Sequence, residues 1–481
     1  MTTHAQSLDN IILLADSYKS SHYLQYPPNT TKVYSYIESR KGESEVTLFF
    51  GLQYFIKRYL LNPITQQHID IAETIITHHG EPFNRAGWEY ILKQHNGYLP
   101  LRIKALKEGS VVPIRNVLIT IENTDPECFW LTSYLETAIL QNIWYPTTVA
   151  TRSYVIRQLL NEYHHKTSDA DIQAVDFKLH DFGQRGCSTM ESAAIGGLSH
   201  LVNFLGTDTM PALLYGQWYY NEPMAGYSIP AAEHSTITSW GRENELNAYR
   251  NMLDCYGKPG KMVAVVSDSY DIFHAVSELW GRELKSLVEN SGATVVIRPD
   301  SGDPTTIPIK VCECLMQNYG YTINSRGYRI LPNCIRIIQG DGITQESLII
   351  LLQNMAQAKM SLDNFAFGMG GGLVQMVNRD TQGFAMKCSA IEVDGHWRDV
   401  YKQPITDSGK NSKRGRFAVV QQDHAIQTIA LNNLNERQDL LELVYENGEL
   451  RREQTFTDIR TLAKNHEHNR PVYQSHHSTN K

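Results

Sequence analysis

The sequence predicts an α/β protein in which a parallel α/β barrel accompanies an α+β domain. From about Val175 to Phe384, short apolar runs repeatedly end in acidic, basic or glycine residues before a helical pattern begins. Successive strand-end acids lie roughly 25 to 40 residues apart, the span of one strand–helix unit. Up to about residue 150, strand and helix patterns are mixed without this repeat, which is typical of an α+β domain.

The amino-terminal part contains the elements expected of the α+β domain. Residues 15–23 have the pattern of a capped first helix and include Asp16 and Tyr18. Alternating or β-branched apolar runs predict strands at 32–37, 101–106 and 117–121, and residues 47–61 have a helical pattern.

The clearest strand end of the barrel lies in residues 294–304. Its uncharged, mostly β-branched residues suit a strand that is covered on both faces, and Pro304 is placed to open the next helix. Arg298 offers a planar fork to a phosphate or carboxylate, and Asp300 can accept hydrogen bonds from sugar hydroxyls. Gly302 lets the backbone approach a ligand closely. Taken alone, this stretch could equally be a surface turn without a ligand.

The same pattern recurs at other predicted strand ends, which favours a ligand site over a surface turn. The polar groups and glycines at these ends are Asp181 with Arg185, Asp208, Asp268, Gly340 with Asp341, and residues 370–372. Because the carboxyl ends of parallel strands meet at one mouth of a barrel, we expect these residues to lie together. A doubly wound sheet would concentrate them at one or two switch points, so we favour the barrel.

The carboxyl-terminal part adds a strand pair and a basic stretch. Residues 384–393 predict a strand that turns at Asp394-Gly395. Lys402 follows, and then the basic stretch of residues 410–416. Such a charge run is usually a solvated loop, but near a phosphate site it becomes a counter-ion cluster.

Length and composition set limits on the protein class. A chain of 481 residues with 42% apolar content should form more than one domain. We expect residues 1–175 to form the α+β domain and 176–384 the barrel. Residues 385–481 should add strands and a basic loop that pack on the first domain, followed by a loosely ordered tail.

The charge and the apolar segments limit the partners and the compartment. The net charge of −7 argues against a nucleic-acid surface. No amino-terminal segment has the length of a signal core or membrane span, so we expect a cytoplasmic protein without a membrane partner. The seven cysteines show neither a disulfide framework nor paired zinc spacing, and we expect them to be reduced and buried.

Long runs of the chain resemble the nicotinamide phosphoribosyltransferases of the type II phosphoribosyltransferase family. They include ADSYKSSHY, FFGLQYF, KLHDFGQRG, HLVNFLGTDT, GYSIPAAEHSTITSWG, VVSDSYDI, VIRPDSGDP, RIIQGDG and AFGMGGGLVQ, between about Asn10 and Leu441. The resemblance implies an irregular α/β barrel with an α+β domain formed by amino- and carboxyl-terminal segments. It implies a homodimer with shared active sites. It also implies synthesis of nicotinamide mononucleotide and pyrophosphate from nicotinamide and phosphoribosyl pyrophosphate in NAD salvage, with Mg²⁺ and with ATP hydrolysis coupled through a phosphohistidine.

The same resemblance implies roles for individual residues. His234 matches the histidine that ATP phosphorylates, and Asp268 and Asp300 complete the catalytic set. Phe182 and Tyr18 of the partner subunit would sandwich the pyridine ring, and Asp208 would meet its carboxamide. The remaining residues implied in substrate binding are Asp16, Arg40, Arg185, Arg298, Gly340, Asp341, Gly370, Gly371, Arg379, Lys387, Lys402 and Lys410. Ala385 departs from the family pattern, because a serine there usually reaches the 5′-phosphate.

Three other functions can be compared with this one. A barrel glycosidase needs two carboxylates and has little use for a set of cations such as Arg185, Arg298, Arg379 and Lys387. Nicotinate phosphoribosyltransferase activity and a non-enzymatic binding protein of the same fold remain alternatives.

Overall fold

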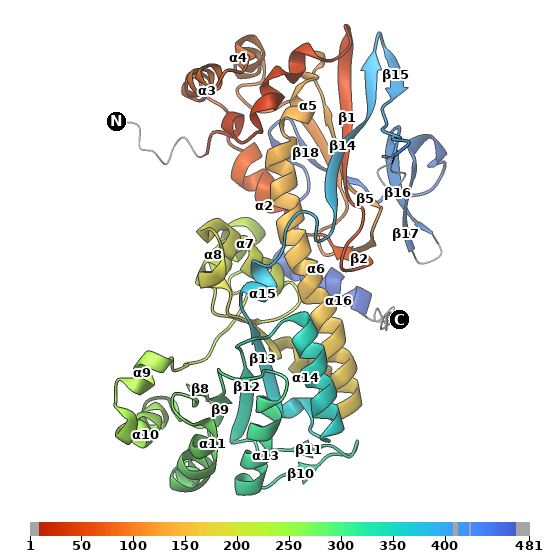
Figure 1. Ribbon diagram of the computed structural model, residues 1–481. Helices are drawn as coiled ribbons and strands as arrows, with labels where there is room; N and C mark the ends of the chain where they lie inside the picture. Colours follow the sequence, from red (N-terminus) through yellow and green to blue (C-terminus); the bar gives the residue numbers. More distant parts are fainter. Residues whose placement is uncertain (1–8, 407–411, 423–424, 468–481) are drawn as a thin grey trace. The chain divides into compact units, whose positions relative to one another are not determined.

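The computed structural model describes residues 9–406, 412–422 and 425–467 and divides into two compact units (Figure 1). Of the described residues, unit 1 contains those up to 151, residues 218–222 and those from 378 onward. Unit 2 contains residues 152–217 and 223–377. The domain boundaries expected at 175/176 and 384/385 divide the chain differently and stay predictions. Lys410 and the tail from residue 468 lie outside the described residues.

Unit 1 is built on a seven-stranded sheet with the order β15-β14-β1-β5-β3-β18-β19, in which the paired strands are antiparallel. Its strands are β1 (Thr30–Ser39), β3 (Leu101–Ala105), β5 (Val117–Asn123), β14 (Phe384–Val393), β15 (His396–Asp399), β18 (Glu442–Glu446) and β19 (Glu449–Leu450). The three strands predicted before residue 150 are therefore confirmed. The turn predicted at Asp394-Gly395 is confirmed as well, with φ angles of 52° and 74° that suit a tight hairpin.

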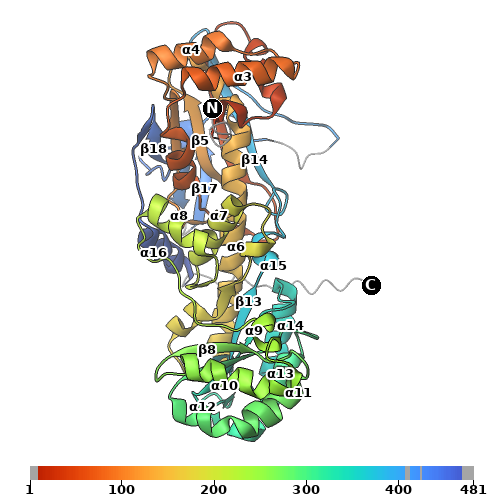
Figure 2. The same cartoon turned by 90° about the vertical axis from the view of Figure 1, so that its left-hand side faces the viewer.

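The other elements of unit 1 lie outside this sheet and include two separate strand pairs, β2 with β4 and β16 with β17. They are η1 (Ile11–Leu13), η2 (Ser17–Leu24), β2 (Val46–Leu48), α2 (Leu52–Phe55), η3 (Ile56–Leu60), α3 (Gln66–His78), α4 (Arg85–Gln94), β4 (Val111–Pro113), η4 (Pro126–Cys128), α5 (Leu131–Tyr134), β16 (Phe417–Gln422), β17 (Ala425–Ala430), η11 (Leu431–Asn433) and α16 (Phe456–Glu467). Helices α3 and α4 pack against each other (Figure 2). The long helix α6 (Glu136–Thr167) contributes residues to both units.

Two predictions for unit 1 were wrong in detail. The helix expected over residues 47–61 begins only at Leu52, because residues 46–48 pair with β4 and Gly51 adopts a φ of 109°. The buried carboxylate of Glu108 accepts hydrogen bonds from the backbone of Gly51 and Gln53, which fixes the helix start. The expected first helix is the 3₁₀ segment η2, and the Asp16 side chain does not cap it.

Unit 2 contains a six-stranded parallel sheet with the order β7-β6-β13-β12-β9-β8. Its strands are β6 (Leu179–Asp181), β7 (Gly206–Thr207), β8 (Met262–Val266), β9 (Thr294–Arg298), β12 (Ile335–Gln339) and β13 (Phe365–Met369). Each of these strands ends within two residues of a strand end that the sequence predicted.

Residues 227–232 close the curled sheet of unit 2. The backbone of Tyr227 pairs with Leu205 and Thr207 beside β7, at 2.7 and 3.0 Å. A few residues later, Pro230 O accepts from Ala264 N of β8, at 2.9 Å. Both edge strands therefore bond to the same segment. The apolar layer inside contains Ala264, Val296, Ile338 and Ala366 from four strands, Ile229 from the closing segment, and Phe182, which follows β6. The irregular α/β barrel is confirmed.

Helices follow the barrel strands and complete unit 2. They are η5 (Ile172–Phe177), η6 (Gln184–Gly186), α7 (Met190–Leu201), α8 (Met210–Tyr220, whose last residues belong to unit 1), α9 (His234–Thr238), η7 (Arg242–Asn244), α10 (Glu245–Tyr256), α11 (Ile272–His274), η8 (Ala275–Glu283), α12 (Lys285–Ser291), α13 (Ile307–Tyr319), α14 (Gln345–Gln357), η9 (Leu362–Asn364) and α15 (Gly371–Val374). The short strands β10 (Thr322–Ile323) and β11 (Arg329–Ile330) form a hairpin.

Three further observations bear on the sequence predictions. Pro304 does not open a helix: Asp303 accepts hydrogen bonds from Thr305 and Thr306 in a turn, and α13 begins at Ile307. The cysteines are free, but Cys255 is exposed, so the expectation that all are buried was wrong. Among the described residues, no helix has the length and apolar character needed to cross a membrane.

Candidate active site

A cavity of about 470 Å³ opens at the carboxyl ends of the barrel strands in unit 2. Residues that follow five different strands line it, as expected for the mouth of a barrel. The lining residues are Phe182, Gln184, Arg185, Met190, Asp208, Arg298, Asp300, Gly340, Asp341 and Gly370. Eight of these were predicted from the sequence to bind substrate, and the structure brings them together. Gln184 and Met190 were not among the predicted site residues.

The ring of Phe182 forms one wall of the cavity. Its backbone N–H donates to Met369 O at 3.0 Å, which ties the residue to the end of β13. Two glycines make room for the ring: a Cβ on Gly368 would lie 2.0 Å from Phe182 Cε2, and a Cβ on Gly340 would lie 3.3 Å from the same atom. The Phe182 ring can therefore occupy this position because neither glycine has a side chain that would collide with it.

Asp208 lies at the end of β7 and is held by two side chains that the sequence analysis did not identify. Its Oδ1 accepts from His180 Nε2 at 2.8 Å and from Ser228 Oγ at 2.6 Å. Burial alone would raise the pKa of Asp208, but the hydrogen bonds and the charges of His180 and Arg298 outweigh it and lower the pKa. Asp208 is therefore a carboxylate that can accept a further hydrogen bond.

Side chains of β6 alternate between the cavity and the protein interior. His180 and Phe182 are neighbours, with ring centroids 4.8 Å apart. Asp181 between them is fully buried and accepts from Gly183 N and Thr209 Oγ1, at 2.8 and 2.6 Å. Asp181 follows the strand-end pattern of the sequence but does not line the cavity, because alternation in a strand sends it to the opposite face. The same alternation could have identified His180.

A chain of polar contacts connects β9, β8 and the start of α9. Asp268 is almost fully buried and accepts from His234 Nε2 at 2.9 Å and from the backbone N–H of Asp300 at 3.0 Å. His234 Nδ1 lies 3.9 Å from Asp300 Oδ2, and Arg298 Nη2 lies 3.5 Å from the same oxygen. The three predicted catalytic residues are therefore adjacent.

Arg298 retains hydrogen-bonding capacity at this site. Its Nε is buried and has no hydrogen-bond partner among the described residues. An unpaired buried donor in a cavity with a second arginine, Arg185, suits an anionic ligand. Gly370, which lines the same cavity, and Gly371 lie at the start of α15, where the first backbone N–H groups of a helix favour anions.

Unit 1 contains the other predicted binding residues. Lys387 is half-buried: burial lowers its pKa, the carboxylate of Glu136 partly opposes this, and the charges of Arg40, Lys19 and Arg379 lower the pKa further, so several cations lie around it. Tyr18 is 54% exposed, and Lys402 is exposed. Asp16 accepts from Thr137 Oγ1 at 2.7 Å, which gives its carboxylate a structural partner.

The described part of the basic stretch has structural partners. Lys413 pairs with the buried carboxylate of Glu38. Arg414 lies over the ring of Tyr401 at 5.2 Å. These cations stabilise unit 1, which neither of the two interpretations of the stretch anticipated.

The fold and the cavity define a class of protein. Cations and backbone N–H groups suited to phosphates, carboxylates suited to sugar hydroxyls and an aromatic wall meet at the mouth of an irregular α/β barrel. This combination is that of a sugar-phosphate-binding enzyme.

The chain belongs to the nicotinate phosphoribosyltransferase (NAPRTase) family, whose model matches residues 177–449. It is thus a pentosyltransferase. Residues 10–103 match the model of the nicotinamide phosphoribosyltransferase N-terminal domain. Both matches confirm the resemblance seen in the sequence.

Individual proteins agree with the family assignment. The nicotinamide phosphoribosyltransferase of Xanthomonas campestris pv. campestris (strain 8004) is 52% identical, over 95% of this chain and 98% of its own. That of Acinetobacter baylyi (strain ATCC 33305 / BD413 / ADP1) is 34% identical, over 92% and 95%.

Solved structures share the fold. Nicotinate-nucleotide pyrophosphorylase from Pyrococcus furiosus has a TM-score of 0.63 at 14% identity and covers 97% of this chain and 96% of its own. Human nicotinic acid phosphoribosyltransferase has a TM-score of 0.60 at 14% identity, with 94% and 93% covered. The predicted type II phosphoribosyltransferase fold is confirmed.

Proposed function

We propose that this protein transfers the phosphoribosyl group of phosphoribosyl pyrophosphate to nicotinamide, forming nicotinamide mononucleotide and pyrophosphate in NAD salvage. The observation that carries the proposal is the position of the Phe182 ring and the Asp208 carboxylate in the same cavity as Arg298, Asp300 and Asp341. The ring and the carboxylate suit an aromatic amide, and the arginine and the two other acids suit a phosphorylated sugar. The cavity can therefore bind the two substrates side by side.

Phe182 and Asp208 orient the pyridine. The pyridine ring stacks on the side chain of Phe182, and Tyr18 of the partner subunit covers the other face of the pyridine. The carboxamide NH₂ donates to Asp208, whose other contacts keep it ionised. This arrangement directs the weakly nucleophilic ring nitrogen at the anomeric carbon.

The second set of groups binds the donor substrate. The ring nitrogen forms a bond to the anomeric carbon as the bond from that carbon to pyrophosphate breaks, so positive charge develops on the sugar and negative charge on the leaving group. Arg185 and Arg298 bind phosphate or pyrophosphate, and Asp300, Gly340 and Asp341 bind the ribose hydroxyls. The 5′-phosphate is bound by Gly370, Gly371, Arg379 and Lys387. The pyrophosphate or the nucleotide phosphates face Arg40, Lys402 and Lys410.

ATP acts through His234. Because Asp268 holds Nε2, that nitrogen carries the proton and Nδ1 keeps the lone pair. Nδ1 attacks the γ-phosphorus of ATP, a P–N bond forms, and the bond to ADP breaks. A phosphoryl group on Nδ1 lies on the side of Asp300, close to where phosphoribosyl pyrophosphate binds.

Mg²⁺ fits the oxygen donors of this cavity. Asp300 and Asp341 are acidic groups beside the phosphate-binding arginines. The ion prefers oxygen ligands and is usually held through substrate phosphates with few protein ligands. When bound, it neutralises charge on the leaving pyrophosphate.

The proposed assembly is a cytoplasmic homodimer with shared sites. Phe182, Asp208 and Arg298 belong to unit 2, whereas Tyr18 and Arg379 belong to unit 1. Groups for one reaction are thus distributed over both units, and a twofold dimer supplies them in pairs.

Nicotinate phosphoribosyltransferase activity is the second candidate, because the family model that covers residues 177–449 carries that name. Product analysis with nicotinamide and nicotinate at equal concentration separates the two. We expect mainly nicotinamide mononucleotide. Mainly nicotinate mononucleotide would contradict the proposal, and no turnover of either pyridine would favour a binding protein of the same fold.

A further inference from the structure

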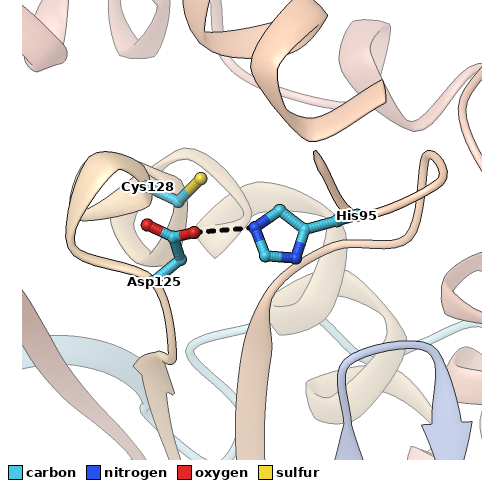
Figure 3. Close-up of side chains that lie close together, drawn as sticks. All are labelled: His95, Asp125 and Cys128. Atoms are coloured by element: carbon cyan, nitrogen blue, oxygen red, sulfur yellow. Dashed lines mark hydrogen bonds and ion pairs between the residues drawn. The ribbon is translucent and has the colours of Figure 1, made fainter. Parts of the chain in front are cut away.

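Three potential metal ligands converge in unit 1, in residues that the proposed reaction does not use. One ring nitrogen of His95, an Asp125 carboxylate oxygen and Cys128 Sγ all lie within 4.8 Å of one another (Figure 3). We propose that His95, Asp125 and Cys128 form a binding site for a divalent transition-metal ion of the Zn²⁺ type.

Two segments far apart in sequence build the cluster. Asp125 caps η4 by accepting from Glu127 N at 2.9 Å, and Cys128 ends that same turn, so the two ligands lie on one side of it. His95 follows α4 directly. The chain then turns sharply through Gly97, whose φ is 80° and where a Cβ would lie 2.3 Å from Ile64 O. This tight packing holds His95 in position.

The donor set suits Zn²⁺. One thiolate, one imidazole and one carboxylate are its usual protein ligands, and an ion with three of them keeps a fourth position for water. Ligand atoms around a tetrahedral Zn²⁺ lie about 3.3 to 3.8 Å apart, given bonds of about 2.0 to 2.3 Å. The His95 Nε2 to Asp125 Oδ2 distance is 2.8 Å, so these two side chains need to separate by less than about 1 Å to admit the ion.

Charge and access also favour a cation. Burial first, and the carboxylates of Asp125 and Glu127 second, raise the pKa of the Cys128 thiol to about 12, so an incoming ion must displace the thiol proton, whereas the two carboxylates attract a cation. Cys128 is buried, whereas the side chains of His95 and Asp125 are 22% and 18% exposed. An ion can therefore enter from the solvent side and reach Sγ behind them. The thiol proton is released to solvent as the bond from Sγ to the metal forms.

An ordinary turn is the alternative explanation. Asp125 Oδ2 accepts from both His95 Nε2 and Tyr90 Oη, at 2.8 and 3.1 Å, and these bonds stabilise the turn without an ion. With an ion present, the Tyr90 hydroxyl takes the supporting role that outer hydrogen bonds have in metal sites.

Co²⁺ distinguishes the two explanations, because a bound thiolate gives it a charge-transfer absorption that histidine and carboxylate ligands do not. The full-length, reduced protein is titrated with Co²⁺ and then with Zn²⁺. We expect a thiolate-to-cobalt band that saturates at one equivalent and that Zn²⁺ abolishes. Absence of this band from the folded wild-type protein would overturn the proposal.

Matched variants locate the site. Cys128→Ala should lose the band, whereas Cys255→Ser, which alters an exposed cysteine, should keep it. His95→Gln should weaken Co²⁺ binding more than tenfold, whereas His79→Gln on the exposed end of α3 should not. Tyr90→Phe should weaken binding about tenfold, the usual effect of removing an outer hydrogen bond.

The remaining outcomes decide against the site. The protein contains 18 histidines, which can bind metal elsewhere without the thiolate band. A band that persists in Cys128→Ala, or equal affinity of the His95 and His79 variants, would contradict the proposal. If Cys128→Ala does not fold, the His95→Gln and His79→Gln pair still gives the answer.

Discussion

The Nε2 atom of His234 lies 2.9 Å from Oδ1 of Asp268, and the same aspartate binds the backbone N–H of Asp300 through its other oxygen. The buried carboxylate of Asp268 therefore orients both the His234 ring and the backbone at Asp300, just after β9. Removing its charge should affect the ATP reaction first.

We expect Asp268→Asn to slow ATP hydrolysis by about 10²- to 10⁴-fold, because the imidazole loses the partner that sets its tautomer.

His234→Ala should abolish ATP hydrolysis but leave slow, ATP-independent synthesis of nicotinamide mononucleotide. Phosphate release and product formation are measured on the same samples. Undiminished ATP hydrolysis in His234→Ala would exclude a phosphohistidine at this position.

Asp208 should determine the choice of amide over acid. Its carboxylate accepts from the carboxamide but repels the carboxylate of nicotinate, and like charges at close range cost several kcal/mol. We expect Asp208→Ser to lose nicotinamide preference and gain relative activity with nicotinate, measured as the ratio of kcat/KM values. Equal use of both pyridines by the wild-type protein would refute this role.

The preference should not change between pH 8 and pH 5. The pKa of Asp208 is lowered, so the group stays ionised throughout this range. A lowered folded-state pKa adds stability above the unfolded value of about 3.9, and that stability is lost as the pH falls through the folded value. The kcat/KM ratio is measured across the range with Asp208→Asn as the control. A wild-type preference that declines between pH 6 and 5 while the Asn variant stays constant would contradict this.

Gly368 should be more sensitive than Gly340 to an added methyl group. A Cβ at Gly368 would lie 2.0 Å from the Phe182 ring, whereas one at Gly340 would lie 3.3 Å away. We expect Gly368→Ala to displace the ring and raise the KM for nicotinamide at least tenfold, or to destabilise the fold by about 1 to 3 kcal/mol. Gly186→Ala, with its nearest neighbour at 3.6 Å, is the control. Normal KM and thermal stability in Gly368→Ala would show that the ring does not depend on this glycine.

Subunit mixing tests the shared active site. Asp208→Ala and Arg379→Ala should each be inactive, with their defects in different subunits of any one site. Random exchange makes about half of the dimers mixed, and one site in each is then intact, so roughly a quarter of wild-type activity should return. Exchange is verified by pull-down of differently tagged subunits. Mixed dimers without recovered activity would place each site in a single chain.

The sequence by itself determined the strands of the barrel and many of the residues at its mouth. Apolar runs such as residues 294–297 can be buried on both faces, and the polar residues that follow must then leave the sheet at its carboxyl end. This local rule correctly placed Arg185, Asp208, Arg298 and Asp341 in one cavity.

The tertiary structure alone decided which side chains support these residues. Local patterns do not identify His180 and Ser228 as the hydrogen-bond partners of Asp208, because they lie 28 and 20 residues away in the sequence. Nor do local patterns predict that residues 227–232 close the barrel. They also do not tell which side chains of β6 reach Asp208: His180 does, whereas Asp181 is buried on the other face. These features depend on contacts between distant segments, whose geometry is set only when the sheet curls and its two edges meet the same strand-like segment.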